Sequence, residues 1–229
     1  MPLLKTPAIV LRSRKWGDAD RIVTFYTLRV GKVRGVGRGA RRLKSRFGSV
    51  LEPFVHCDLN LFEKPNDTLY RISQADIREP FTRLREDLGL MAGAARLANL
   101  VNAVAAEGDP SPRTFEILLE GLQALEATQE PGLTALVFQI RLLGQSGYRP
   151  QTGQCAACGI RFPARNGPGV VRFSPSAGGV VCERCVSRVP DRCFVLSPGS
   201  VAMLERVPQM VPSALGRLKA AGQVRAELE

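Results

Sequence analysis

Two cysteine pairs carry the clearest metal-binding chemistry in the chain. Cys155 and Cys158 frame the motif CAAC, and Cys182 and Cys185 repeat the same spacing in CERC. Thiolates spaced in this way reach one tetrahedral ion together, and two such pairs complete a four-cysteine shell with Zn–S distances of about 2.3 Å. The motifs therefore predict one structural Zn²⁺ ion per chain, with a redox dithiol or unrelated buried thiols as alternatives. A closed shell leaves no position for water or substrate, so the metal is not expected to be catalytic.

The chain contains two further cysteines. Cys57 lies on the inward side of an alternating strand pattern and is expected to be a plain core thiol. Cys193 follows Cys185 closely enough to compete as a ligand, but the regular double CxxC arrangement favours leaving it out of the shell. Six cysteines in a protein expected to be cytosolic indicate metal ligands or buried thiols more than a disulfide framework.

A second chemical feature is the basic segment, residues 31–48, which reads GKVRGVGRGARRLKSRFG. It holds seven cations and five glycines and no acidic residue, so it is expected to be the end of a strand followed by a mobile, solvated loop. A polyanion is the natural partner of such a loop. The predicted nucleic-acid-binding residues are Arg12, Arg14, Lys15, Arg21, Lys32, Arg34, Arg38, Arg41, Arg42, Lys44 and Arg46.

The positive charge is concentrated near the N-terminus. Residues 1–50 contain 13 lysines and arginines and two aspartates, an excess equal to the whole formal charge of +11, and the other residues balance. This distribution is typical of a nucleic-acid-binding module attached to a neutral body. A solubilising basic face or a ribosome-like RNA contact would give the same pattern.

The N-terminal third is predicted to be a small β-barrel. Short segments rich in β-branched residues cover residues 8–16, 21–28, 32–39, 55–61 and 69–77, with turns between them, including one over residues 64–67. In the fourth segment Val55, Cys57 and Leu59 alternate with His56 and Asp58, which places the first set in the core and the second in solvent. An OB-type barrel fits five strands and a long cationic loop, although an SH3-like barrel would give a similar pattern.

Helical periodicity begins after Pro80. The first predicted helix carries Leu84, Leu88, Met91 and further apolar residues to Val104 on one face. Ser111-Pro112 and Pro131 open two more helices, and Ser197-Pro198 and Pro212-Ser213 open the last two.

The resulting fold class is an α+β multidomain protein, with an N-terminal OB-type β-barrel followed by an α-helical bundle that carries a small four-cysteine zinc-finger insertion. The predicted domains are a nucleic-acid-binding barrel over residues 1–79, a helical domain over 80–149, the zinc unit over 150–190, and C-terminal helices over 191–229 that pack with the helical domain. The N-terminal apolar run is too short for a signal peptide and no window reaches the ~20 apolar residues of a membrane span, which predicts a cytoplasmic protein.

The residues offer little for an enzyme. The sole histidine, His56, falls on the polar side of its strand and is expected at the surface, and no nucleophile–base constellation forms around it. The sequence GVGRGARR lacks the Gly-Lys-Ser/Thr ending of a Walker A loop. Asp18 and Asp20 are more typical of turn-shaping residues than of nuclease magnesium ligands. A binding protein is therefore expected, with an OB-fold RNA-binding or ribosome-associated zinc protein as the alternative class.

The order of these parts resembles the bacterial RecO family of recombination mediators. The local motifs are Gly17-Asp18-Ala19-Asp20 before RIVTFYTL, where the family commonly has Gly-Glu-x-Asp; Thr27 with Gly31; residues 37–46; and Leu51-Glu52-Pro53-Phe54. The resemblance covers essentially the whole chain. Some members of the family lack the four cysteines, so the resemblance implies that zinc is a scaffold feature.

The resemblance implies a non-enzymatic DNA repair protein associated with the nucleoid. It would bind single- and double-stranded DNA, anneal complementary strands and, with RecR, help to load RecA on strands coated with single-strand-binding protein. The acidic C-terminal tail of that protein is expected to use Arg83, Arg85, Arg96 or Arg141. For base stacking, one or two of Phe25, Tyr26, Phe47, Phe54 and Tyr70 are candidates, and the others would be barrel core.

Overall fold

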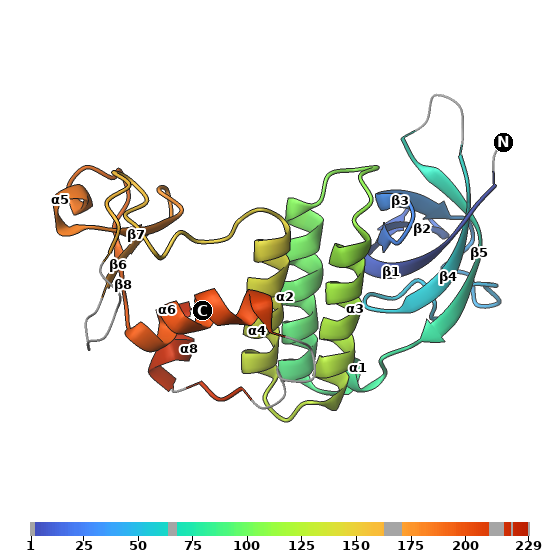
Figure 1. Cartoon of the computed structure of the whole chain (residues 1–229). Coiled ribbons are helices and arrows are strands. Elements are labelled where there is room, and N and C mark those ends of the chain that lie inside the picture. The colour runs from blue at the N-terminus through green and yellow to red at the C-terminus, as the bar shows by residue number, and fades with distance from the viewer. Residues whose placement is uncertain (1–2, 64–67, 163–170, 211–217, 221, 229) are drawn as a thin grey trace. The chain divides into compact units, whose positions relative to one another are not determined.

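Five strands at the N-terminus form a closed barrel (Figure 1). The computed structural model describes residues 3–63, 68–162, 171–210, 218–220 and 222–228. The strands are β1 (Leu3–Trp16), β2 (Asp20–Thr27), β3 (Gly31–Gly37), β4 (His56–Phe62) and β5 (Tyr70–Glu79), and they follow the order β1-β2-β3-β5-β4 around the barrel. The prediction of a five-stranded OB-type barrel is confirmed. The predicted turn over residues 64–67 lies outside the described residues.

Strand β1 belongs to both halves of the barrel. Its first half pairs with β4 and its second half with β2, and the register shifts between Val10 and Arg12. β3 and β5 form a parallel pair that completes the closure. Inward-facing residues such as Val10, Phe25 and Leu59 are almost fully buried, so the barrel interior is a packed hydrophobic core.

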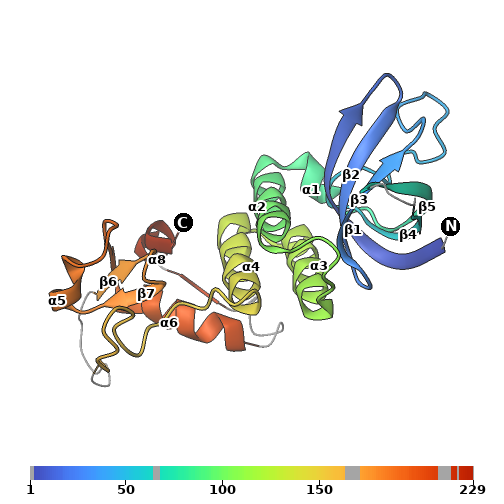
Figure 2. The same ribbon diagram turned by 90° about the horizontal axis from the view of Figure 1, so that it is seen from above.

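Three helices follow the barrel within the same compact unit, Met1–Phe138 (Figures 1 and 2). They are α1 (Arg83–Glu86), α2 (Leu88–Val104) and α3 (Pro112–Ala127), and α4 (Pro131–Gln145) begins before the end of the unit. The predicted starts of α3 and α4 are confirmed. Ser111 accepts a hydrogen bond from the Thr114 backbone, and Pro112 occupies the first turn, as the capping pattern predicts.

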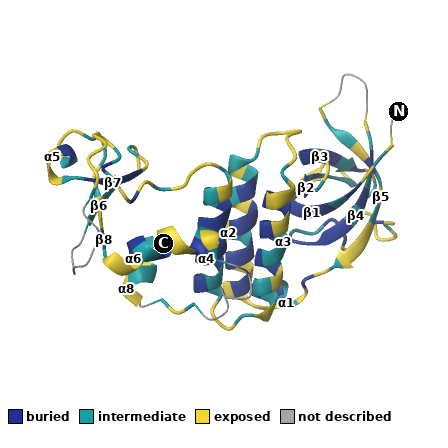
Figure 3. Cartoon of the chain, in the orientation of Figure 1, coloured by how far each residue is buried: buried dark blue, intermediate teal, exposed yellow. Residues whose placement is uncertain are grey.

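The single helix predicted from Leu84 to Val104 is wrong in two respects. Asp87 has extended backbone angles and breaks the helix, and its side chain caps α2 by accepting a hydrogen bond from Leu90 N at 2.9 Å. The break also changes which face is buried. Leu88 is 84% exposed, whereas Leu90 and Leu97 lie in the interior. Figure 3 shows buried and exposed residues alternating around the turns of α2.

His56 is not at the surface, which corrects the prediction for this residue. It is only 6% exposed, because Phe115 of α3 covers it with an edge-on ring contact at 5.9 Å between centroids. Its Nδ1 lies 3.4 Å from Glu79 Oε2. The alternation rule holds for Asp58 and Asn60, which are half-buried, but a helix packed on the outer side of β4 overrides it at His56.

Burial lowers the pKa of His56 below its usual 6.5, and the hydrogen bond with Glu79 offsets this only in part. Below pH 6.5 the unfolded chain therefore binds a proton on His56 more readily than the folded chain does, and the free energy of unfolding should fall as the pH drops. Because the chain has one histidine, its imidazole proton resonance in NMR reports this site alone. We expect a titration midpoint below 6.5 in the folded protein and near 6.5 in urea; a folded midpoint above 6.5 would contradict the burial argument.

The second compact unit, Gln139–Glu229, contains a small sheet and short helices. Strands β6 (Val171–Ser174), β7 (Gly179–Val181) and β8 (Phe194–Leu196) form the order β7-β6-β8, and α5 (Glu183–Val186) follows β7. These strands, of three or four residues each, show no alternation long enough to predict them from sequence.

The C-terminal segment of this unit forms α6 (Pro198–Arg206), the 3-10 helix η1 (Val207–Gln209) and α8 (Gly222–Leu228). The predicted start at Ser197-Pro198 is confirmed, whereas the start predicted at Pro212-Ser213 lies outside the described residues. Burial would raise the pKa of Glu227, but hydrogen bonds from Ser200 and Ser197 outweigh it and lower the pKa to about 2. The ionised Glu227 thereby joins α8 to the start of α6. None of the described helices is long and apolar enough to cross a bilayer.

Candidate nucleic-acid interface and metal centre

Strand β1 carries a row of cations on its outer side, and β2 and β3 continue the same face of the sheet. Side chains alternate along a strand, so Arg12, Arg14 and Trp16 of β1 share one side, and all three are exposed. Arg14 pairs with Ile22 of β2, and Ile22 pairs with Val36 of β3, so these residues continue the same side across the sheet. Strand faces of this kind hold oligonucleotides in OB barrels.

Strand β5 adds a cation that sequence reasoning missed. Arg71 pairs with Val36 across the parallel β3–β5 contact and is exposed. Its neighbour Ile72 points into the core beside Gly35, which places Arg71 outward. The alternation of apolar and polar residues in LYRIS indicates that Arg71 faces outward. The charge pattern did not select Arg71, because it lies in the part of the sequence with no net charge.

The basic loop, which is the part of the basic segment that follows β3 (residues 38–48), is held to the barrel by buried residues at both ends. Ala40 and Phe47 are 9% and 4% exposed and belong to the barrel core, while Arg42, Lys44 and Arg46 between them are exposed. Successive turns close the loop, with backbone hydrogen bonds such as Arg42 N to Gly39 O. The expectation of a mobile, solvated loop was thus too simple, because Phe47 is part of the core.

Several predicted DNA-binding cations make internal contacts. Arg21 pairs with Glu52 at 2.9 Å, Arg34 pairs with Glu107 at 3.1 Å, and Lys32 Nζ donates to Asn102 O at 2.8 Å. Arg41 donates to the carbonyls of residues 17 and 18. Within the described part of the chain, no carboxylate lies at ion-pair distance from the other predicted cations, which are all exposed: Arg12, Arg14, Lys15, Arg38, Arg42, Lys44 and Arg46.

The aromatic residues predicted as stacking candidates are mostly core. Phe25, Tyr26, Phe47 and Phe54 are all at most 8% exposed. Tyr70 is half-buried and packs against the barrel core. The aromatic side chain that this surface does present is Trp16, 56% exposed at the end of β1, and sequence reasoning did not consider it.

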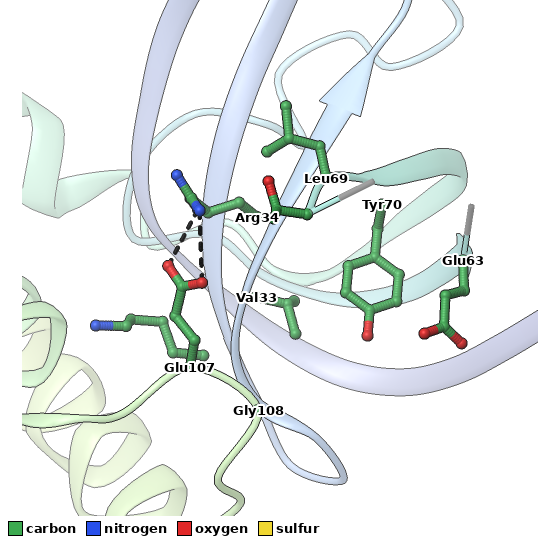
Figure 4. A pocket seen from close by; sticks show the side chains of 9 residues that line it. Val33, Arg34, Glu63, Leu69, Tyr70, Glu107 and Gly108 are labelled. Carbon is green, nitrogen blue, oxygen red and sulfur yellow. Dashed lines mark hydrogen bonds and ion pairs between the residues drawn. The ribbon is translucent and has the colours of Figure 1, made fainter. Parts of the chain in front are cut away.

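A pocket of about 250 Å³ opens beside β3, lined by Lys32, Arg34, Tyr70 and two carboxylates, Glu63 and Glu107 (Figure 4). Glu107 neutralises the Arg34 guanidinium with a two-point contact. Lys32 is held by α2 through its contact with Asn102. This pocket is unsuited to a phosphate group, because it holds two carboxylates and both of its cations already contact other groups of the protein.

The structure brings four thiols of the second unit together. The sulfur atoms of Cys155, Cys158, Cys182 and Cys185 all lie within 4.8 Å of one another. The Cys158–Cys182 sulfur separation is 3.8 Å. A tetrahedral zinc ion with Zn–S bonds of about 2.3 Å requires sulfur separations of about 3.8 Å. The donor set and its spacing therefore fit zinc.

Local backbone structure positions both cysteine pairs. After the first pair the chain turns back through Gly159 at φ +75°, and Gly159 N donates to Cys155 O. The second pair starts directly after β7, where Cys182 occupies the N-cap position of α5 without a side-chain hydrogen bond, and Cys185 lies within that short helix. Gly179 of β7 lies so close to Gln151 that a side chain there would collide with the backbone carbonyl. This approach holds the strand that carries the second pair beside the segment that carries the first.

The environment of Cys155 favours an anionic sulfur. Burial raises the pKa of this thiol, but backbone N–H groups of residues 182, 158 and 157 outweigh burial and lower the pKa to about 6. Cys182 N lies 3.3 Å from Cys155 Sγ. A thiolate already favoured before metal binding is a suitable first ligand for a cation.

The remaining candidates have structural roles. Cys193 packs beside the cysteine cluster but is not one of its four members. Cys57 is fully buried in the barrel core, where burial raises the pKa of its thiol to about 12. Asp20 Oδ1 accepts a hydrogen bond from Gly39 N at 2.8 Å, so this carboxylate ties the β1–β2 turn to the basic loop.

Models of one known protein family match both parts of the chain. The family model "Recombination protein O N terminal" matches residues 1–81, and "Recombination protein O C terminal" matches residues 85–229. The DNA repair protein RecO of Rubrobacter xylanophilus is 38% identical over 90% of this chain and 81% of its own length. RecO of a Nocardioides species is 42% identical over 88% of this chain and 81% of its own length. RecO of Symbiobacterium thermophilum is 34% identical over the whole of this chain and 89% of its own length. The chain therefore belongs to the RecO family of DNA repair proteins.

Proposed function

We propose that this protein is a non-enzymatic recombination mediator that binds DNA through the outer face of β1 to β3 and the basic loop. The observation that carries the proposal is the row of exposed cations on β1 together with the exposed cations of the loop. Contacts between these cations and phosphates release counterions, which gives affinity without sequence preference and a steep salt dependence.

Annealing of complementary strands follows from the same surface. Two backbones repel each other, and a basic face that contacts both lowers this repulsion. Membership of the RecO family supports the further steps, in which the protein acts with RecR to load RecA on strands coated with single-strand-binding protein.

The acidic tail of single-strand-binding protein would bind the helical region. Arg83 and Arg85 are poor candidates, because both guanidinium groups already donate to backbone carbonyls, those of residues 126 and 128 for Arg83 and of 80 and 53 for Arg85. Arg141 is 3% exposed, whereas Arg96 is exposed on α2. On the ground of its exposure alone, Arg96 is the first of the four to substitute in a tail-binding assay.

The four clustered cysteines would hold one structural zinc ion. The ion would supply coordination bonds that hold the two cysteine pairs together, and no chemistry on a substrate. Its role would be confined to the fold of the second unit, since the proposed DNA-binding residues belong to the first.

The test of this function is annealing of complementary strands precoated with single-strand-binding protein, followed by fluorescence over a range of salt. We expect the protein to accelerate annealing and the acceleration to fade as salt rises. Binding to bare strands without acceleration would reduce the proposal to a general OB-type nucleic-acid binder. An RNA strand of the same sequence belongs in the same experiment, because tighter binding to RNA would favour the ribosome-associated alternative.

A further inference from the structure

Two large apolar side chains project from the most basic part of the molecule. Trp16 is 56% exposed at the end of β1, and Leu43 in the basic loop is as exposed as in an extended chain, at 104%. Single exposed apolar residues are common on proteins and need no explanation. These two differ in their surroundings, since Arg14, Lys15, Arg42 and Lys44 adjoin them in sequence and are all exposed.

Trp16 continues the cation row of β1. It shares the outer side of that strand with Arg12 and Arg14, and same-side residues of a strand lie about 6.7 Å apart. Its partner across the hairpin is Asp20, whose carboxylate binds the backbone of Gly39 in the basic loop. The indole is therefore placed at the edge where the strand face meets the loop.

The loop that carries Leu43 is fixed to the same hairpin. Arg41 N donates to Ala19 O at 2.8 Å, and the Arg41 guanidinium donates to the carbonyls of Gly17 and Asp18 at 3.2 and 3.0 Å. The buried residues Ala40 and Phe47 anchor the loop on both sides of Leu43. Both apolar side chains are thus held by one connected element, the hairpin end and the loop.

The surroundings select the kind of ligand. An apolar peptide would leave the cations without counter-charges, and duplex DNA hides the faces of its bases within the stack. Single-stranded DNA offers phosphates and uncovered base faces at short, regular spacing, and aromatic side chains stack on any base. This ligand matches both the charge and the apolar surface.

We propose that Trp16 stacks on an unpaired base of single-stranded DNA and that Leu43 packs against a base of the same strand, while the neighbouring cations bind its phosphates. This inference rests on the proposed DNA-binding function and adds a base-contacting site to it. It gives the surface a preference for unpaired strands that phosphate contacts alone do not supply.

Trp16 is the only tryptophan of the chain, so its emission reports this site directly. Titration with an oligothymidylate should quench the emission in step with the rise in anisotropy of a labelled strand, whereas a duplex of equal length should bind with little quenching. By anisotropy, Trp16→Ala should weaken single-strand binding about 10-fold, Trp16→Phe should retain most of the affinity, and Leu43→Ser should weaken it to a smaller extent.

The control is Ile77→Ala, which removes an exposed apolar residue from β5 of the same barrel and should leave the affinity unchanged. Binding without quenching, together with normal affinity of Trp16→Ala, would overturn the base-contacting site and leave DNA binding intact. Equal losses for duplex and single strand in Trp16→Ala would also overturn it. Failure of the unmodified protein to bind either strand would instead refute the proposed function.

Discussion

Replacement of Arg38, Arg42 and Lys44 by Glu should lower the affinity for an oligothymidylate about 100-fold at moderate salt. These three side chains are exposed and pair with no carboxylate in the described ranges of the chain, so they are available to phosphates. Arg41 is left unchanged, because its guanidinium holds the β1–β2 turn and its replacement would disturb the loop itself. A salt series measured by anisotropy should show a slope lower by about 2, since each phosphate contact contributes about 0.7 for single strands.

The matched control reverses three exposed arginines of the second unit, Arg149, Arg188 and Arg192. It changes the net charge by the same amount, but away from the proposed surface. We expect its affinity and salt slope to remain near those of the unmodified protein. Equal losses in the two variants would mean that binding depends on total charge and not on the barrel face, and a normal salt slope in the first variant would place the site elsewhere.

Much of the architecture was predictable because it depends on local patterns. Short segments rich in β-branched residues, separated by turns, marked the five barrel strands. The Ser-Pro pairs at 111–112 and 197–198 marked helix starts, because capping is decided by neighbouring residues. The CxxC spacing likewise selected four cysteines whose sulfur atoms lie together in the structure. Each of these features acts over a few residues.

The errors arose where distant elements meet. His56 is buried because Phe115, far along the chain, covers it, and no property of the strand signals that cover. The error at Leu88 has a local cause instead: Asp87 breaks the predicted helix and caps a new one, and Leu88, predicted on the apolar face, is exposed. The sequence also did not indicate which cations are free to bind phosphates. Arg34 and Lys32 contact residues 107 and 102, which meet the barrel only after folding.

Loss of one zinc ligand should have the second large effect. Cys155→Ser should reduce bound zinc from about one ion per chain to near zero after dialysis, measured by elemental analysis, because a four-cysteine shell with a missing thiolate binds far more weakly. The surrounding segment should then become sensitive to limited proteolysis. Its strands have only three or four residues, and the buried residues of its core cluster are Val181, Cys155 and Cys185. So small a core cannot hold the segment without the metal, which supplies about 10–16 kcal/mol in comparable sites.

Cys193→Ser is the matched control, because Cys193 packs beside the cluster without belonging to it. The Cys193→Ser variant should retain zinc and resist proteolysis. Full zinc content in the Cys155→Ser variant would exclude Cys155 as a ligand. Oxidation of the cysteines to disulfides in the purified, zinc-free protein, with no change in proteolysis, would favour the redox alternative.

DNA affinity and zinc content should change independently in the two variants. The Cys155→Ser variant should bind DNA normally, whereas the variant with Glu at positions 38, 42 and 44 should keep its zinc. This opposite pattern is expected because the cations and the thiolates stabilise different contacts, one set with an external polyanion and the other with an internal metal ion.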